Sequence, residues 1–323
     1  MSFKDLKAQD KAVYLLESIL KSRRIAPALL FWGEEGVGKK LAAVNFAKAL
    51  NCLENNVSPC QECASCRKID NHNHPDVFFL PKDDLSEAIK IEEIRQLQKI
   101  ASLKSLEAKK KVFIIDQAHN LTPEAANAFL KILEEPPADT LFILITSKPE
   151  LMFSTIRSRC QSVRFCAMPK KDLSNVLQKD FGVEPKTSHY LAYFYQGRLG
   201  ASLRMKDNDI LRRKNRIIQW LMDEYDDAQE IERQNKRELK ESLEILLSWF
   251  RDIYLIKTGL AHSELIHLDL INQLLETMPR LSFYDLDTAI NFLSDASLYL
   301  EQNVNPKLIL ANLKARLWTK LRR

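Results

Sequence analysis

The stretch Ala28-Leu-Leu-Phe-Trp-Gly-Glu-Glu-Gly-Val-Gly-Lys-Lys40 decides the fold. Its first five residues are apolar and stop at Gly33, which is typical of a strand buried on both faces. Gly36 and Gly38 allow backbone N–H groups to turn inward around a phosphate, and Lys39 stands where it would reach the terminal phosphates of a nucleotide. An alanine- and leucine-rich helical segment follows directly. A strand, a glycine-rich loop and a helix in this order predict a P-loop.

Four further apolar runs continue the pattern of strands separated by helical segments. Between two of these runs, Thr122 offers a capping hydroxyl and Pro123 suits a first helical turn, whereas Pro136 cannot continue a helix. A helix is therefore expected over about 123–135. The alternation predicts an α/β fold over residues 1–167, with a parallel sheet flanked by helices. The four runs lie at 77–80, 112–115, 141–145 and 163–165.

The pattern changes in the second half of the chain, where no strand-like run of comparable strength follows. Residues 168–207 form a short helical stretch that opens with Pro169. Residues 208–323 are charged and helix-periodic, as in Glu241-Ser-Leu-Glu-Ile-Leu-Leu-Ser-Trp-Phe250, and they predict an all-α third domain. Within that domain, the acidic run 223–230 is expected to be a solvated face or loop.

Two positions in the expected nucleotide site depart from what ATP hydrolysis needs. The residue after the P-loop lysine normally carries a hydroxyl that binds magnesium, but Lys40 has no acceptor and adds a positive charge. After the run 112–115, Asp116 retains a carboxylate for magnesium, but Gln117 replaces the usual glutamate, and an amide cannot accept a proton from water. Hydrolysis is therefore not expected, and the loop either binds ATP weakly or is retained as architecture. The candidate nucleotide site consists of Gly33, Gly36, Gly38, Lys39, Lys40 and Asp116.

Four of the six cysteines, Cys52, Cys60, Cys63 and Cys66, follow the spacing C-x7-C-x2-C-x2-C. Four thiolates at this density suit a tetrahedral zinc ion, and the short spacings let one tight turn present neighbouring sulfurs. The alternative, four free thiols in one loop, would oxidise readily. Because four sulfur ligands leave no open coordination position, the predicted zinc site is structural.

Composition limits the remaining possibilities. The 323 residues are 46% apolar and 28% charged, which is typical of a globular protein with two or three domains. A net charge of +5 permits contact with nucleic acid without requiring it. The N-terminus lacks the apolar core of a signal peptide, and no stretch is apolar enough to span a membrane. A cytoplasmic location is expected, and there clustered cysteines favour metal over disulfides.

These motifs resemble those of the clamp-loader family of AAA+ proteins over residues 8–205. Because the P-loop hydroxyl and the catalytic glutamate are both missing, the combination is similar to the delta-prime branch rather than to the gamma and tau branch, which retains both. The resemblance implies a RecA-like AAA+ domain with a zinc-binding insertion at about 52–66, a helical lid domain over 168–207 and a collar domain over 208–323. The motifs are the degenerate P-loop 33–40, the cysteine insertion, His74-Pro-Asp76, Asn127-Ala-Phe-Leu-Lys-Ile-Leu-Glu-Glu-Pro-Pro137 and Arg157-Ser-Arg-Cys160.

The resemblance also implies that Arg159 is an arginine finger, which reaches the ATP bound by a neighbouring subunit. A guanidinium near the γ-phosphate stabilises the charge that develops during phosphoryl transfer. From the residues alone, a surface arginine or a structural salt bridge is the favoured explanation of this position. In the lid, ATPases of the family carry a sensing arginine. Gly200 stands in its place here, with Arg198 close by but out of register.

The implied function is that of a non-hydrolysing subunit in a heteropentameric clamp loader of DNA polymerase III. Its partners would be the delta and gamma or tau subunits, the sliding clamp and, through the assembled complex, primed DNA. Two alternatives stay open: a catalytically active gamma- or tau-like ATPase, and a nucleic-acid-binding protein built on the zinc site with an inactive ATPase scaffold. ATP turnover by the purified chain would favour the first, and salt-dependent DNA binding by the isolated chain the second.

Overall fold

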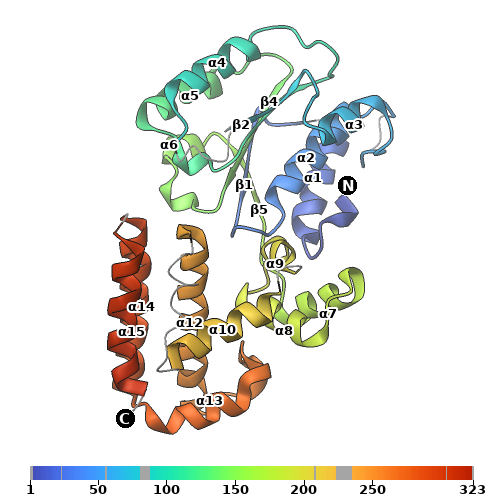
Figure 1. Cartoon of the computed structure of the whole chain (residues 1–323). Coiled ribbons are helices and arrows are strands. Elements are labelled where there is room, and N and C mark those ends of the chain that lie inside the picture. The colour runs from blue at the N-terminus through green and yellow to red at the C-terminus, as the bar shows by residue number, and fades with distance from the viewer. Residues whose placement is uncertain are drawn as a thin grey trace. The chain divides into compact units, whose positions relative to one another are not determined.

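The five apolar runs form one parallel sheet with the strand order β2-β3-β4-β1-β5 (Figure 1). Each strand begins and ends within two residues of its predicted run, so the predicted α/β fold is confirmed. The parallel pairing follows from the helices that connect successive strands. The strands are β1 (Ala28–Trp32), β2 (Val77–Leu80), β3 (Lys111–Ile115), β4 (Thr140–Thr146) and β5 (Gln161–Arg164).

The structure is a computed structural model, and it divides into two compact units. The first unit contains Met1–Met168 together with Arg198–Ala201, and the second contains Pro169–Gly197 together with Ser202–Arg323. The predicted separation of a lid (168–207) from a collar (208–323) stays a prediction, as does the acidic loop at 223–230, which lies outside the described residues. The described residues are 3–22, 24–54, 57–80, 88–206, 209–222, 235–302 and 304–321.

Helices cover both faces of the sheet in the first unit (Figure 1). The helix α5 begins as its sequence predicts, because the Thr122 hydroxyl accepts a hydrogen bond from the Ala125 N–H at 3.2 Å and Pro123 is the first helical residue. One layer consists of α1 (Asp10–Ser22), α2 (Lys39–Asn51) and α3 (Ala64–Asp70). The other consists of α4 (Ile91–Ala101), α5 (Pro123–Glu134) and α6 (Ser154–Arg157).

Alternate residues of each strand face opposite helical layers, which explains why the strands are apolar throughout. In β4, Leu141, Ile143 and Ile145 pack in the core that includes α1 and α2. Phe142 and Leu144 pack in the second core, with residues of α4 and α5. The sheet is therefore buried on both sides.

The described residues of the second unit are helical and contain no strand. A single core surrounds Trp249 and Phe250 of α12, both of which are buried and pack with residues of α10, α14 and α15. The periodic apolar residues predicted from the sequence form this core. The helices are α7 (Lys170–Phe181), α8 (Pro185–Phe194), α9 (Leu199–Met205, shared between the units), α10 (Ile210–Met222), α12 (Lys236–Lys257), α13 (Ile271–Thr277), α14 (Phe283–Glu301) and α15 (Pro306–Leu321).

Buried charged groups anchor the segment that follows α12. The Lys214 ammonium lies 2.5 Å from a carboxylate oxygen of Asp269. The buried Asp252 carboxylate accepts hydrogen bonds from the N–H groups of Ile266 and His267 at 2.8 and 2.7 Å. Burial raises the pKa of Asp252 to about 6, although these N–H groups oppose the rise. The segment is thus held to α12 by hydrogen bonds as well as by apolar contacts.

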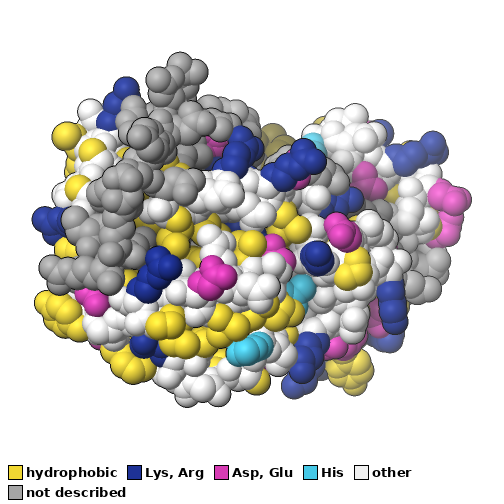
Figure 2. Space-filling model, turned by 60° about the horizontal axis from the view of Figure 1, so that its bottom comes forward, with side chains coloured by type: hydrophobic (Ala, Val, Ile, Leu, Met, Phe, Trp, Pro, Cys, Tyr) yellow, Lys and Arg dark blue, Asp and Glu magenta, His cyan; other side chains and the backbone are white. Residues whose placement is uncertain are grey.

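The charged side chains of one face are dispersed. On the face drawn in Figure 2, Lys and Arg side chains lie among acidic, hydrophobic and neutral ones rather than in one continuous basic area over the residues described there. The residues described on that face therefore do not form the dense positive area typical of a dedicated nucleic-acid-binding surface. Of the helices that the structure describes, none has the length and apolar character needed to cross a bilayer.

Candidate functional site

The phosphate loop joins β1 to α2 and depends on its glycines. Gly33 has a φ of 146°, and a Cβ atom placed there would lie 2.1 Å from the Phe165 carbonyl oxygen. Gly36 has a φ of 83°, a left-handed conformation that side chains disfavour. The loop therefore has the backbone shape that the sequence predicts, with Gly38 as the last residue before α2.

Lys39 binds the phosphate loop itself. Its Nζ donates to the carbonyl oxygens of Gly33 at 2.6 Å and Glu34 at 2.5 Å, and the side chain is almost fully buried. Burial lowers the pKa of Lys39 to about 8, although Asp116 and the loop glutamates oppose the decrease. Its ammonium has three N–H donors, so two of them are already used within the loop before a phosphate binds.

Lys40 lies beside the carboxylate that was expected to bind magnesium. Its Nζ is 3.5 Å from Oδ2 of Asp116, at the end of β3. In an active P-loop site, a hydroxyl at this position and the acidic residue bind the same metal ion. Here the ammonium supplies the positive charge directly, which leaves a divalent cation with less attraction and one ligand fewer. Lys40 thus has a partner in the fold that the sequence did not reveal.

Gln117 and its neighbours complete the end of β3. The Gln117 side chain accepts a hydrogen bond from the Asn120 amide at 3.1 Å, so its oxygen is already engaged. His119, two residues on, lies 2.9 Å from the Thr146 hydroxyl at the end of β4. Burial, followed by the nearby Lys148, lowers the pKa of His119 and favours the neutral ring. Sequence reasoning missed the pair of His119 and Thr146, because only the sheet brings the two strand ends together.

Residues 198–201 close over the phosphate loop within the first unit. The Gly200 N–H donates to the Gly36 carbonyl oxygen at 2.8 Å, and a Cβ at Gly200 would lie 2.8 Å from that same oxygen. Arg198 forms a long ion pair with Glu34, with 3.9 Å between Nε and Oε2. Gly200 is therefore a close backbone contact as well as the residue at the place expected for a sensing arginine.

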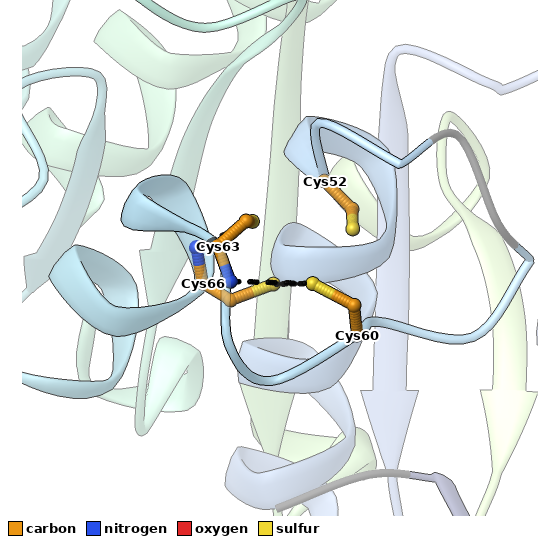
Figure 3. Close-up of side chains that lie close together, drawn as sticks. All are labelled: Cys52, Cys60, Cys63 and Cys66. Atoms are coloured by element: carbon orange, nitrogen blue, oxygen red, sulfur yellow. Dashed lines mark hydrogen bonds between the residues drawn. The ribbon is translucent and has the colours of Figure 1, made fainter.

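The four predicted cysteines converge between α2 and α3 (Figure 3). Their sulfur atoms all lie within 4.8 Å of one another, and those of Cys60 and Cys66 are 4.0 Å apart. Four sulfurs at about 2.3 Å from a tetrahedral zinc ion would be about 3.8 Å apart. All four cysteines are free of disulfides. The geometry therefore fits a single metal ion held by four thiolates.

Backbone N–H groups and burial shift the pKa values of thiols in the cluster in opposite directions. The Cys63 N–H points to the Cys60 sulfur at 3.3 Å, and the Cys66 N–H to the Cys63 sulfur at 3.4 Å. Burial would raise the pKa of Cys63, but N–H groups of Leu53 and Cys66 outweigh it and lower that pKa to about 6. Burial raises the pKa of Cys66. A cation would favour the thiolate form of all four, because it replaces their protons.

The cysteine cluster is attached to the segment that precedes β3. Two hydrogen bonds join Asn51 and Lys110. The Asn51 Nδ2 donates to the Lys110 carbonyl oxygen at 2.9 Å, and the Lys110 N–H donates to Asn51 Oδ1 at 3.0 Å. The Lys109 ammonium donates to the Cys52 carbonyl oxygen at 2.6 Å. Nearby, the buried His74 accepts a hydrogen bond from the Asp76 N–H at 3.1 Å, so this histidine serves the turn into β2.

Arg159 lies away from the phosphate loop, on the turn after α6. Its guanidinium donates to the Thr155 carbonyl oxygen at 3.1 Å and to Oε1 of Glu134 at 2.9 Å. The side chain is 39% exposed. The structure thus brings together the residues of the nucleotide site and, separately, the four cysteines, and it leaves Arg159 at the surface.

The parallel sheet, its phosphate loop and the helical unit beyond it define the class as AAA+ P-loop proteins. Two family models match: "DNA polymerase III, delta subunit" over residues 8–169 and "DNA polymerase III, delta subunit, C terminal" over residues 211–317. The DNA polymerase III subunit delta' of Bacillus subtilis is 30% identical over 322 residues, which cover 94% of this chain and 95% of that protein. The chain therefore belongs to the DNA polymerase III delta and delta-prime subunit family.

Other similar proteins match the same fold. The tau subunit of DNA polymerase III from B. subtilis is 39% identical over 164 residues, which are 50% of this chain but only 29% of that longer protein. A solved structure of a gamma subunit-related protein of DNA polymerase III from Thermotoga maritima covers 96% of this chain and 99% of its own, with a TM-score of 0.54 and 18% identity. That structure supports the fold over the whole chain.

Proposed function

We propose that this chain is the delta-prime subunit of a DNA polymerase III clamp loader and does not itself hydrolyse ATP. The loader would contain delta and gamma or tau subunits, and it would open the sliding clamp and place it on primed DNA. Similarity to the B. subtilis subunit over 94% of the chain supports the assignment. The tau match covers only half of this chain and 29% of the tau subunit, so it supports shared ancestry of a part rather than the same role.

The ion pair between Lys40 and Asp116 is the observation that carries the absence of hydrolysis. Hydrolysis of Mg-ATP needs a hydroxyl that binds magnesium and a carboxylate that activates water. This site has Lys40 in place of the hydroxyl and Gln117 in place of the carboxylate. Lys39 and the N–H groups of the loop could still attract a phosphate. We therefore expect any nucleotide to be bound weakly and not to be turned over.

Arg159 would act on a neighbour's nucleotide rather than on this chain's own. Its guanidinium is accessible and retains donors beyond the two that bind Thr155 and Glu134. Placed against the γ-phosphate of a partner's ATP, it would stabilise the charge that develops as the phosphoryl group transfers. The subunit would then contribute to hydrolysis without having a complete site.

The remaining parts would serve assembly. A structural zinc ion on Cys52, Cys60, Cys63 and Cys66 would hold α3 and the end of α2 together. Residues 168–207 would form a lid, and residues 208–323 a collar that joins the five subunits of the loader in the cytoplasm. The collar role is supported by the match of residues 211–317 to the C-terminal family model.

Two measurements test the proposal. The purified chain with Mg-ATP should show turnover at background level, whereas a robust rate would favour the gamma- or tau-like alternative. Expressed with its neighbours in the cell, the tagged chain should co-purify with delta and gamma or tau subunits. Recovery of the chain without them would contradict the clamp-loader assignment.

A further inference from the structure

The Arg159 guanidinium is fixed by acceptors on two different helices. The Thr155 carbonyl lies in α6, four residues earlier in the chain, and accepts from Nη1 at 3.1 Å. The Glu134 carboxylate is at the end of α5 and accepts from Nη2 at 2.9 Å. A long, accessible side chain normally samples many rotamers. Two acceptors at different positions favour one orientation of its planar group.

Both acceptors stand on backbone that is itself held. Glu134 is the last residue of α5, and the following Glu135 donates its N–H to the Lys131 carbonyl at 3.2 Å before two prolines stop the helix. On the other side, the N–H of Arg159 donates to the Ile156 carbonyl at 3.1 Å, which closes the turn after α6. The ion pair therefore joins side chains on two backbone segments that are each closed by a hydrogen bond.

We propose that Glu134 is a positioning residue that orients Arg159 for the ATP of a neighbouring subunit. This inference rests on the proposed role of Arg159 as a finger. The guanidinium has five N–H donors, and the two hydrogen bonds to Glu134 and Thr155 leave others free for phosphate oxygens. Arg159 can thus keep its carboxylate contact while it binds an anion, so orientation is retained at the moment of reaction.

The exposure of the pair sets the size of the effect. The side chains of Arg159 and Glu134 are 39% and 54% exposed, so water and salt screen their attraction. An exposed ion pair of this kind changes an equilibrium by up to about fivefold. Loss of the carboxylate should therefore lower the fraction of correctly oriented guanidinium by about two- to fivefold. Loss of the guanidinium itself removes the whole effect of the finger, about a hundredfold or more.

The test is steady-state ATP hydrolysis by the assembled loader, in which the ATP sites that do not face this chain are inactivated at their own P-loop lysines. Glu134→Ala should lower kcat about two- to fivefold with little change in KM, because orientation matters in the transition state. Glu134→Gln, which keeps an oxygen acceptor, should retain most of kcat. Glu135→Ala is the matched control, since it removes the same charge one residue away, and it should leave kcat unchanged. Equal melting temperatures would show that all variants fold alike.

The outcomes separate this inference from the proposed function. If Arg159→Ala leaves hydrolysis unchanged, the finger itself is refuted. If Arg159→Ala abolishes hydrolysis but Glu134→Ala has no effect, the finger stands and the positioning role is overturned. An increase in kcat for Glu134→Ala would also overturn it, because the carboxylate would then restrain Arg159 rather than orient it. If Glu134→Ala and Glu135→Ala lower kcat equally, the effect comes from the change in net charge, and the positioning role is overturned.

Discussion

The phosphate loop and the cysteine cluster are both sites where a cation is expected, and they differ in what supplies the positive charge. In the phosphate loop, the Lys40 ammonium lies 3.5 Å from Asp116, so the protein carries its own cation. In the cysteine cluster, four sulfurs lie within 4.8 Å of one another and form a complete set of donors. One site pairs its acidic residue with a lysine, and the other gathers four sulfurs that could hold a metal ion.

The two sites differ in what the loss of a ligand would cost the fold. A zinc ion in the cluster would stabilise the local fold, so loss of one ligand is costly. The hydroxyl and carboxylate of an active phosphate loop act on magnesium and nucleotide, so their replacement can leave the backbone shape intact. Gly33 and Gly36 keep their positive φ values although the residues that act on ATP are replaced.

Loss of a cysteine ligand should have the largest effect on stability. If it does not, the contrast between the cysteine cluster and the phosphate loop is wrong. Cys63→Ser should lower the zinc content from about one ion per chain to near zero and lower the free energy of unfolding by about 4 kcal/mol or more. Metal analysis and chemical denaturation would measure the two changes. Cys166→Ser, at an exposed cysteine outside the cluster, is the control and should change neither.

Removal of the metal should also loosen the segment before β3, a local change that chemical denaturation of the whole chain does not detect. The segment before β3 is held through Asn51, Lys109 and Lys110, which bond to the cluster or to the end of α2. Chelation should therefore speed hydrogen exchange of the Lys110 amide, while the buried amides of β4 stay protected. Unchanged exchange at Lys110 would mean that the thiols hold this segment without metal.

A substitution at Gly33 tests whether the phosphate loop is retained as architecture. Gly33→Ala should destabilise the fold by about 2–3 kcal/mol, because its Cβ would lie 2.1 Å from the Phe165 carbonyl oxygen. Gly182→Ala is the control, since its φ is also positive, at 66°, but no atom lies within 4 Å of the new Cβ. That variant should cost only about 1 kcal/mol. Equal losses in chemical denaturation would show that the loop relaxes freely.

The sequence predicts the cysteine cluster better than the phosphate site for a physical reason. All four sulfurs come from one short segment, so their spacing almost determines their geometry. The phosphate site combines β1, β3, β4 and residues 198–201, and contacts among these depend on the register of the sheet. The missing hydroxyl and carboxylate were readable from Lys40 and Gln117, but the ion pair of Lys40 with Asp116 was not.

The same limit applies to the rest of the fold. Strands and helices followed from apolar runs, capping residues and prolines, because those signals act over a few residues. The bond from Gly200 to Gly36 and the pair of His119 with Thr146 join residues from distant segments. No local pattern encodes such contacts. The ion pair of Glu134 with Arg159 was hidden likewise, although both residues belong to recognised motifs.

Replacement of Lys40 should sharpen the contrast between the two cation sites. Lys40→Thr removes the ammonium and restores a hydroxyl, so Mg-ADP should bind about tenfold more tightly than to the unmodified chain. Calorimetry with and without magnesium would measure this. Lys40→Met removes the charge but supplies no ligand, so it should gain little magnesium dependence. If both variants bind alike, the missing hydroxyl is not what excludes the metal.

A last effect concerns the charge of Lys39. Its pKa in the fold, about 8, is below the usual lysine value because burial disfavours the ammonium. Between pH 8 and about 10.4 the unfolded chain therefore binds more protons than the folded chain, and stability gains with rising pH. The contribution can reach at most about 1.4 kcal/mol per pH unit, and less if water reaches the ammonium. Lys39→Met should lack this pH-dependent gain. From pH 8 to pH 10, the free energy of unfolding of the unmodified chain should therefore rise relative to that of the variant. A difference that is flat over this range would mean that Lys39 keeps its ordinary pKa and that its bonds to the Gly33 and Glu34 carbonyls offset the cost of burial.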